Sequence, residues 1–167
     1  TYDAVDAMRM AIMAGVAMSL GLESTYFSDR YTGDPLILFR IFNYPGTSSA
    51  VDGEPRWGVG EHTDYGLLTI LKQDDTGGLQ VKARARWVPA PPVPGTFLCN
   101  IGDMLDRMTG GRYRSTPHRV QNVTGRDRLS YPFFFDPSFD AEVRPIEPLD
   151  ASRVAADRQE RWDGASV

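Results

Sequence analysis

Apolar side chains near the start of the chain recur three or four residues apart, the spacing of one face of a helix. These positions are Val5, Met8, Ile12, Val16 and Leu20. Asp3 is a suitable N-cap residue, and Gly21 is a suitable C-terminal stop. The pattern therefore predicts a helix over residues 3–21 that packs through its apolar face.

Most of the remaining apolar residues form short runs bounded by Gly, Pro, Asn or Asp, which is typical of β-strands. The expected strands are Leu36–Tyr44, Leu67–Leu71, Leu79–Lys82, Arg86–Val88, Thr96–Asn100 and a strand that begins at Arg128. The prolines at 89, 91, 92 and 94 indicate a connection, because proline cannot donate to a central ladder. Residues 102–109 are predicted to form a short helical turn, and residues 150–162 a C-terminal helix.

Composition and charge exclude some classes of function. The chain has 167 residues, 41% hydrophobic and 24% charged, as expected for one soluble globular domain. A net charge of −4 without a Lys/Arg block argues against a nucleic-acid partner, and no apolar run is long enough to span a membrane. The single cysteine, Cys99, fits a reducing compartment and lies in an apolar run, which predicts a buried thiol. We therefore expect a cytoplasmic location.

The two histidines of the chain suggest a metal site. His62 is followed two residues later by Asp64, and His118 lies far along the sequence. Residues i and i+2 of an extended strand point to the same face, so His62 and Asp64 can approach one ion together. Two histidines and one carboxylate are the minimum ligand set of a mononuclear non-haem iron site. The spacing therefore predicts that these three residues bind iron.

A second pair with this spacing follows ten residues after His118. Arg128 and Ser130 share one face of the predicted strand, and the segment from Val120 to Arg128 is predicted to run strand, tight turn, strand. A guanidinium beside a hydroxyl suits a carboxylate ligand. The alternative is a surface arginine that pairs with a neighbouring aspartate, such as Asp127 or Asp136.

These motifs stand in an order that resembles a known family. The chain is similar, over residues 36–145, to the core of the Fe(II)- and 2-oxoglutarate-dependent dioxygenases of the isopenicillin N synthase-like superfamily. The landmarks are Gly58–Asp64, Gly77–Val81, Trp87–Pro89, Asn100–Asp103, Ser115–Val120 and Arg128–Ser130. The resemblance implies a mainly β fold, a double-stranded β-helix (jelly roll) with flanking N- and C-terminal helices.

The resemblance also implies roles for individual residues. His62, Asp64 and His118 would bind Fe(II), and Arg128 with Ser130 would hold the distal carboxylate of 2-oxoglutarate. Tyr44 matches a tyrosine that helps to bind this cosubstrate in many relatives. Some relatives carry an asparagine two residues before that tyrosine, where this chain has Phe42, so that contact is not expected.

The expected activity is the coupling of oxidative decarboxylation of 2-oxoglutarate by O2 to hydroxylation or a related oxidation of a small organic substrate. Tyr65 and Phe134 are candidate walls of the substrate pocket; Phe134 shares the strand face of Arg128, although core packing explains it equally well. Two alternatives remain open. One is an iron oxidase of the same fold that does not use 2-oxoglutarate, and the other is a catalytically incompetent barrel that binds a small molecule or a protein.

We expect a single domain with three parts. Residues 1–35 would form a supporting helix and linker, residues 36–145 the jelly-roll core, and residues 146–167 the C-terminal helix. Members of the family usually carry a substantial region before this core, so we expect the chain to lack that region. The sequence does not identify the substrate or the oligomeric state.

Overall fold

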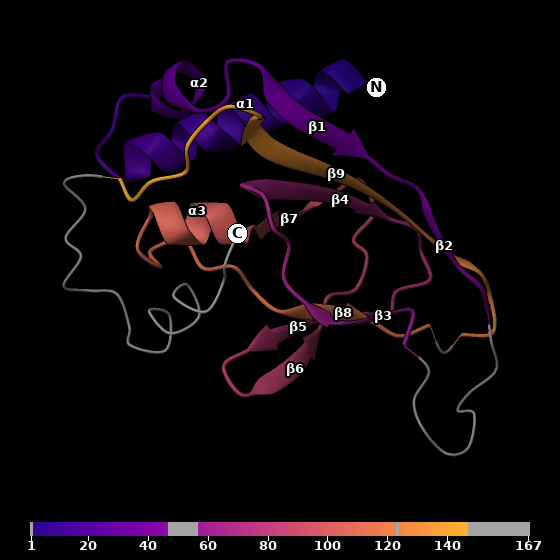
Figure 1. Ribbon diagram of the computed structural model, residues 1–167. Coiled ribbons are helices and arrows are strands. Elements are labelled where there is room, and N and C mark those ends of the chain that lie inside the picture. Colours follow the sequence, from indigo (N-terminus) through magenta and orange to yellow (C-terminus); the bar gives the residue numbers. More distant parts are fainter. Residues whose placement is uncertain (1, 47–56, 123, 147–167) are drawn as a thin grey trace.

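The computed structural model describes residues 2–46, 57–122 and 124–146 (Figure 1). In chain order the elements are α1 (Tyr2–Ser19), α2 (Tyr26–Arg30), β1 (Pro35–Phe39), β2 (Phe42–Tyr44), β3 (Val59–His62), β4 (Leu68–Gln73), β5 (Leu79–Ala83), β6 (Arg86–Pro89), β7 (Leu98–Ile101), α3 (Asp103–Met108), β8 (His118–Val120) and β9 (Arg128–Ser138). The helix predicted over residues 150–162 lies outside the described residues.

Two antiparallel sheets form the body of the fold. The large sheet has the strand order β1-β9-β4-β7, with β2 also paired to β9, and the small sheet has the order β3-β8-β5-β6. Figure 1 shows the large sheet above the small one, with α1 and α2 covering the outer face of the large sheet. This arrangement confirms the predicted mainly β, jelly-roll class and its N-terminal helix.

Alternation along the strands of the large sheet separates the core from the space between the sheets. On β4, Leu68 and Ile70 are buried against α1, and on β9 Phe133 and Phe135 join the same cluster. The residues between them, among them Phe134, line a cavity on the other face. Successive strand residues point to opposite faces, so the buried core face and the cavity face come from the same strands.

The first helix is close to its predicted bounds, and Gly21 explains its end. The φ angle of Gly21 is +76°, a conformation that glycine adopts without steric cost. The amide of Leu22 donates to the carbonyl of Ala17, and the amide of Gly21 donates to that of Met18, both at 3.0 Å. These two bonds form a Schellman motif, which satisfies carbonyls that the helix end would leave free.

The strand predicted over Leu36–Tyr44 is divided into β1 and β2. From Ile37 onward both pieces pair with β9 in one register, since Phe39 lies opposite Phe133 and Phe42 opposite Ser130. Between them the amide of Arg40 donates to the carbonyl of Pro132 at 3.0 Å. Proline has no amide hydrogen to return that bond, so the ladder is interrupted there while the chain stays extended.

The turn before Arg128 connects the two sheets. Strand β8 belongs to the small sheet and β9 to the large one, and Gly125 in the turn has a φ of +70°. The predicted order of strand, turn and strand is therefore present, but the two strands do not pair with each other. Because consecutive strands belong to different sheets, residues on both can face one cavity.

The prediction of a buried Cys99 is wrong. Cys99 lies on β7, the edge strand of the large sheet, and it is exposed. The apolar run from Phe97 to Cys99 therefore lies along the edge of the large sheet, and Phe97 is itself 41% exposed. An apolar run alone does not distinguish an edge strand from a central one, since only the position in the sheet decides burial.

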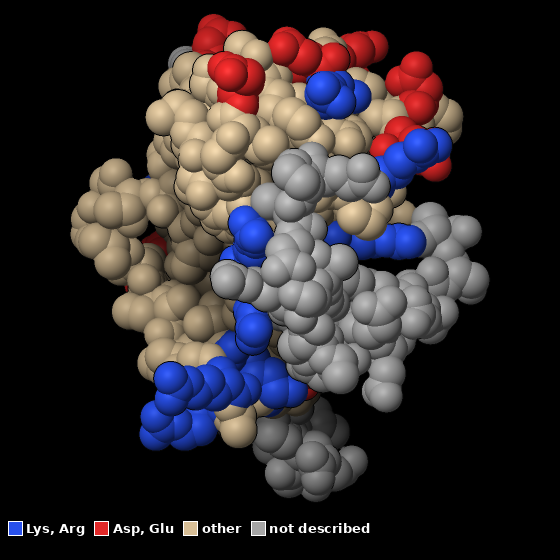
Figure 2. All heavy atoms as spheres, turned by 90° about the vertical axis from the view of Figure 1, so that its left-hand side faces the viewer, with Lys and Arg blue, Asp and Glu red and all other residues tan. Residues whose placement is uncertain are grey.

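On the face shown in Figure 2, acidic and basic side chains gather in different regions. Acidic side chains lie over α1 and α2, and basic side chains gather over the hairpin of β5 and β6. The hairpin supplies Lys82, Arg84 and Arg86, which are not consecutive in the sequence but lie together once the strands pair. None of the helices in the described part of the chain is long and apolar enough to cross a membrane.

Candidate metal centre

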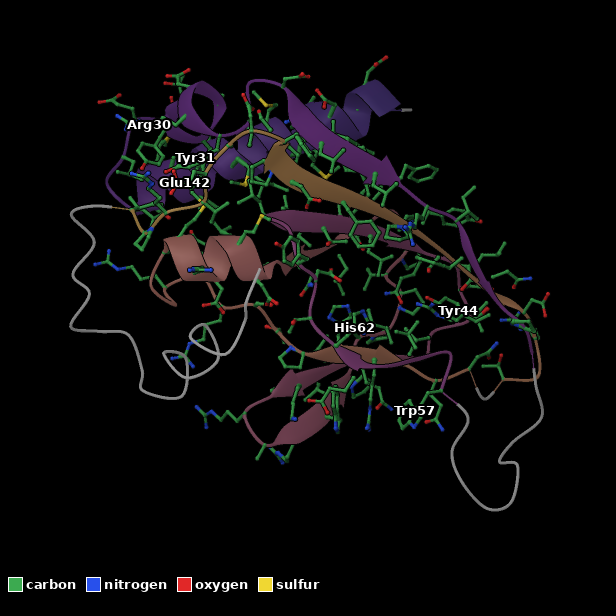
Figure 3. The ribbon with its side chains drawn as sticks, viewed as in Figure 1. Arg30, Tyr31, Tyr44, Trp57, His62 and Glu142 are labelled. Atoms are coloured by element: carbon green, nitrogen blue, oxygen red, sulfur yellow. The ribbon has the colours of Figure 1, made fainter. Side chains whose placement is uncertain are left out.

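A cavity of about 410 Å³ lies between the two sheets. Its walls include the cavity faces of β1, β2, β4 and β9, together with His62 and His118 from the small sheet. Figure 3 shows His62 directed from the small sheet into this space. All the residues predicted for the iron, the cosubstrate and the substrate pocket line the same cavity. They are His62, Asp64, His118, Arg128, Ser130, Tyr44, Tyr65 and Phe134.

The two histidines lie opposite each other on neighbouring strands. His62 on β3 is the register partner of His118 on β8, and their ring centroids are 4.2 Å apart. The Nδ1 atom of His62 is 2.9 Å from the carbonyl oxygen of Gly60, and that of His118 is 3.1 Å from the carbonyl oxygen of Thr116. A carbonyl only accepts, so each Nδ1 donates a proton to it, and in that neutral tautomer Nε2 would offer its lone pair to a metal.

Asp64 supplies the third donor atom. Its Oδ1 lies 3.8 Å from Nε2 of His62 and 3.5 Å from Nε2 of His118. Its Oδ2 accepts hydrogen bonds from Thr69 Oγ1 at 2.6 Å and from Asn100 Nδ2 at 2.8 Å. One oxygen is therefore held by the large sheet, and the other faces the two imidazoles. Hydrogen bonds of this kind orient a metal ligand before the metal binds.

The loop that carries Asp64 differs in one respect from the prediction. His62 is the last residue of β3, and Asp64 lies beyond the strand in the connection to β4, so the two do not share one strand. The amide of Asp103 donates to the carbonyl of Asp64 at 2.8 Å, and the hydroxyl of Thr63 donates to Asp103 Oδ2 at 2.9 Å. The start of α3 thus fixes the loop, because Asp103 contacts both Asp64 and Thr63.

The donor set fits a single divalent ion. The three candidate ligand atoms lie within 4.8 Å of one another. Two neutral imidazole nitrogens and one carboxylate oxygen on one side of an ion are the donors of a non-haem iron site with open positions. Among the described residues this is the one group of histidine and carboxylate side chains that meets these distances.

Arg128 is a buried cation with one nitrogen that has no hydrogen-bond partner. Its side chain is fully buried, Nε donates to the carbonyl of Gly77 at 2.5 Å, and Nη2 donates to Gln73 Oε1 at 3.0 Å. Nη1 is buried without a hydrogen-bond partner. Burial lowers the pKa of the Arg128 guanidinium, which Tyr44 and Asp74 partly offset. The alternative of a surface arginine paired with an aspartate is therefore wrong.

A carboxylate at Nη1 would complete the arginine site. An uncompensated buried charge is strongly unfavourable, and none of the described carboxylates forms an ion pair with Arg128. Tyr44 lies opposite Arg128 in the β2–β9 ladder, with the guanidinium carbon 5.1 Å from the centre of its ring. Ser130 lies two residues along β9 and is 3% exposed. The three residues thus surround one end of the cavity.

The candidate substrate walls differ in exposure. Phe134 is half-buried and lies one register pair from the core-facing Phe133, while Tyr65 is 56% exposed. Trp57 does not line the cavity, because its ring stacks on Arg119, whose guanidinium carbon lies 4.1 Å from the ring centre. Figure 3 shows Trp57 on the side of the small sheet away from His62.

Several residues that line the cavity or support its side chains are not predicted from the sequence. Thr69 and Asn100 orient Asp64, Gln73 orients Arg128, and Arg40 and Asp136 add charge to the walls. Burial, with the charge of Asp64 second, raises the pKa of the Asp136 carboxyl. Strand parity could have found Asp136, which has the parity of Arg128 and Phe134. The other contacts depend on which strands pair, and spacing along the sequence does not give that.

Comparison with known proteins agrees with this arrangement. The sequence profile of the 2OG-Fe(II) oxygenase superfamily matches residues 36–137. A Dictyostelium discoideum protein described as a probable iron/ascorbate oxidoreductase is 55% identical over the whole chain, which covers 50% of that protein. A 1-aminocyclopropane-1-carboxylate oxidase of Dictyostelium mucoroides is 44% identical over 93% of the chain, again 50% of its length. The chain thus spans about half the length of these relatives.

A solved structure has the same fold. It is that of a full-length Neurospora crassa protein crystallised with α-ketoglutarate (2-oxoglutarate) and 5-formyluracil, and it superposes with a TM-score of 0.81 at 29% identity. The match covers 95% of this chain and 52% of that one.

Proposed function

Because the chain belongs to the 2OG-Fe(II) oxygenase superfamily, we propose that its cavity is the active site of a non-haem iron oxygenase. The activity would couple oxidative decarboxylation of 2-oxoglutarate to hydroxylation or a related oxidation of a small organic substrate. One observation carries this proposal. Three convergent donor atoms of His62, Asp64 and His118 face the same cavity as the buried, unpartnered Nη1 of Arg128.

The iron ligands of this proposal are prepared by their hydrogen bonds. His62 and His118 each direct Nε2 inward because Nδ1 is held by a backbone carbonyl. Asp64 directs Oδ1 inward because Thr69 and Asn100 hold Oδ2. Bound iron would activate O2, which is the oxidant of both 2-oxoglutarate and the substrate, and the protein supplies placement and charge. These contacts support Fe(II) as the cofactor.

The cosubstrate would be held at the other end of the cavity. Arg128 would donate Nη1 to the distal carboxylate of 2-oxoglutarate, with a second hydrogen bond from the hydroxyl of Ser130. Tyr44 would cover this end from β2. The buried cation attracts the distal carboxylate and leaves the α-keto acid end to face the iron ligands. The substrate would then enter between Tyr65 and Phe134, at the part of the cavity that remains.

A second candidate function is an iron oxidase that does not use 2-oxoglutarate. The 44% identity to a 1-aminocyclopropane-1-carboxylate oxidase supports it, as does the 55% identity to a relative named for iron and ascorbate. Arg128 favours 2-oxoglutarate, because its buried Nη1 has no hydrogen-bond partner among the described residues and a ligand carboxylate would supply one. The domain division at residues 35 and 145, the cytoplasmic location and the small-molecule substrate stay predictions.

Succinate release distinguishes the two candidates. The purified chain is supplied with Fe(II), O2 and 2-oxoglutarate, or with ascorbate in place of 2-oxoglutarate, and succinate is measured. The proposal predicts slow succinate release that requires both Fe(II) and 2-oxoglutarate and is lost in Asp64→Ala. Retained release in Asp64→Ala would contradict the proposed site. Iron binding without any succinate would favour the oxidase or an incompetent barrel.

A further inference from the structure

Two charged residues of the cavity have no place in the proposed machinery. The proposed function assigns most of the charged or ionisable groups among the described cavity residues. The two imidazoles and the Asp64 carboxylate would bind iron, and the Arg128 guanidinium would bind 2-oxoglutarate. Arg40 and Asp136 remain. Because charges on cavity walls select complementary ligands, these two residues bear on the class of substrate.

Arg40 lies on the cavity wall formed by β1 and β2. Leu38, Phe42 and Tyr44 have the same strand parity and line the cavity with it. Its backbone pairs with Pro132, but its exposed side chain forms no hydrogen bond or ion pair with the described residues. The guanidinium is therefore available at this wall. It lies between the Tyr44 end of the cavity and Leu38.

Asp136 lies further along β9 on the same face. Its carboxylate packs against Gly66, where an added Cβ would collide with Oδ1. The side chain is half-buried and has no hydrogen bond or ion pair within the described part of the chain. Burial raises the pKa of this carboxyl, and the nearby Asp64 adds to the effect. A cation beside Asp136 would offset both.

An apolar section separates the two charges. Leu38 lies opposite Phe134 in the β1–β9 ladder, between the level of Arg40 and that of Asp136. Pro132, the partner of Arg40, is four residues from Asp136, or roughly 13 Å along an extended strand. The arginine side chain is long enough to shorten this gap by several ångströms. A ligand that contacts both groups therefore needs a short hydrocarbon part between its charges.

From this arrangement we infer that the substrate is a small molecule of the amino-acid class. Its carboxylate pairs with Arg40, its cationic nitrogen pairs with Asp136, and its hydrocarbon part lies against Leu38 and Phe134. The inference rests on the proposed function, since the remaining charged walls are assigned to iron and 2-oxoglutarate. It orients the substrate along β9, with its cationic nitrogen at the Asp136 end of the cavity, near Asp64.

A length series tests this inference. The probes are the ω-amino carboxylates from glycine to 6-aminohexanoate and the basic α-amino acids. Each has a matched alkyl amine and a matched alkanoate. Binding is measured by anaerobic calorimetry with Fe(II) and 2-oxoglutarate present, and turnover is measured as succinate release above the level without substrate. We expect a doubly charged probe to bind at least about tenfold more tightly than its matched amine or acid, because each pairs only one wall charge.

Two variants assign the contacts. Arg40→Gln should weaken binding of the best doubly charged probe at least about tenfold and leave its matched amine unaffected. Asp136→Asn should weaken the same probe and leave its matched alkanoate unaffected. Arg86→Gln and Asp140→Asn remove exposed charges outside the cavity and should change neither. If Arg40 or Asp136 had only a structural role, its substitution would weaken binding of the matched amine and alkanoate as much as binding of the doubly charged probe.

The outcomes separate this inference from the proposed function. If basal succinate release is present but no doubly charged probe exceeds its matched compounds, the substrate class is wrong and the oxygenase assignment stands. An equal loss of affinity for the matched amine in Arg40→Gln, or for the matched alkanoate in Asp136→Asn, would also overturn the inferred substrate class. If the wild-type chain shows neither cosubstrate binding nor succinate release, the proposed function itself fails.

Discussion

The free Nη1 atom of Arg128 is the residue-scale feature with the clearest consequence. Removal of one partner of a buried charge pair typically costs about 2–5 kcal/mol, and about 1.4 kcal/mol is one decade of affinity. Arg128→Gln should therefore weaken 2-oxoglutarate binding at least about tenfold in anaerobic titrations. Ser130→Ala removes one neutral hydrogen bond and should cost about 1 kcal/mol.

The matched control for Arg128 is a neighbour on the turn. Arg126 has a side chain that is 63% exposed and forms a surface ion pair with Asp75 at 3.5 Å. Surface pairs of this kind contribute little, so Arg126→Gln should leave cosubstrate affinity unchanged. Unchanged affinity in Arg128→Gln as well would remove Arg128 from the site.

Thr69 should matter for iron although it does not bind it. Its hydroxyl donates to Asp64 Oδ2 at 2.6 Å from a buried position. Thr69→Val keeps the shape and removes the donor, and loss of such a supporting contact typically lowers metal affinity about 10–100-fold. Competition with a chelator gives the affinity. Thr96→Val, which removes an exposed hydroxyl bonded to Val93, should have no effect.

At this scale the sequence identifies the candidate ligands better than the residues that support them. Strand parity groups Arg128 with Ser130, whereas His62 and Asp64 come together because they lie two residues apart at the end of β3. Thr69 and Asn100 contact Asp64 only because β4 pairs with β7 and both face the loop after β3. That contact needs the strand order of two sheets, which no local pattern contains.

At the scale of elements, the close approach of α3 to the Asp64 loop is the most sensitive point. A Cβ at Gly102 would collide with the carbonyl oxygen of Gly66, which is backbone and cannot move aside alone. Gly102→Ala should therefore displace the loop and reduce both thermal stability and iron stoichiometry.

Gly15 provides the matched control for this substitution. It lies inside α1, and a Cβ there would meet nothing within 4 Å. Gly15→Ala should stabilise the chain by up to about 1 kcal/mol, because glycine is a poor helix residue. Both effects are measurable by thermal unfolding with metal analysis. Equal behaviour of the two variants would show that the packing of Gly102 against Gly66 has no special importance.

The sequence predicts the strands well where burial is two-sided and less well at edges. Strand β4 has apolar residues on both faces, and its predicted bounds lie within two residues of the observed ones at either end. Strand β7 has a similar apolar run but lies at the edge of the large sheet, so Cys99 is exposed. The division of β1 from β2 follows from Pro132 on the partner strand, which the sequence of β1 and β2 does not contain.

At the scale of the whole molecule, ligands that bind only the folded chain should raise its melting temperature. The stabilisation is RT ln(1 + [L]/Kd), or about 2.7 kcal/mol at a hundredfold excess over Kd. Anaerobic Fe(II) should stabilise the wild-type chain, and 2-oxoglutarate should add to the effect. In Arg128→Gln the rise in melting temperature caused by Fe(II) should persist, while the further rise caused by 2-oxoglutarate should be lost. A 2-oxoglutarate increment that survives in Arg128→Gln would place the cosubstrate elsewhere.

The most direct test of the proposed site is an anaerobic titration of the Fe(II)-loaded chain with 2-oxoglutarate, followed by visible absorption. We expect a weak charge-transfer band that saturates at one 2-oxoglutarate per iron. We also expect no band in Asp64→Ala and a band only at higher 2-oxoglutarate in Arg128→Gln. A wild-type chain that binds iron but never develops the band would contradict the claim that iron and 2-oxoglutarate meet in this cavity.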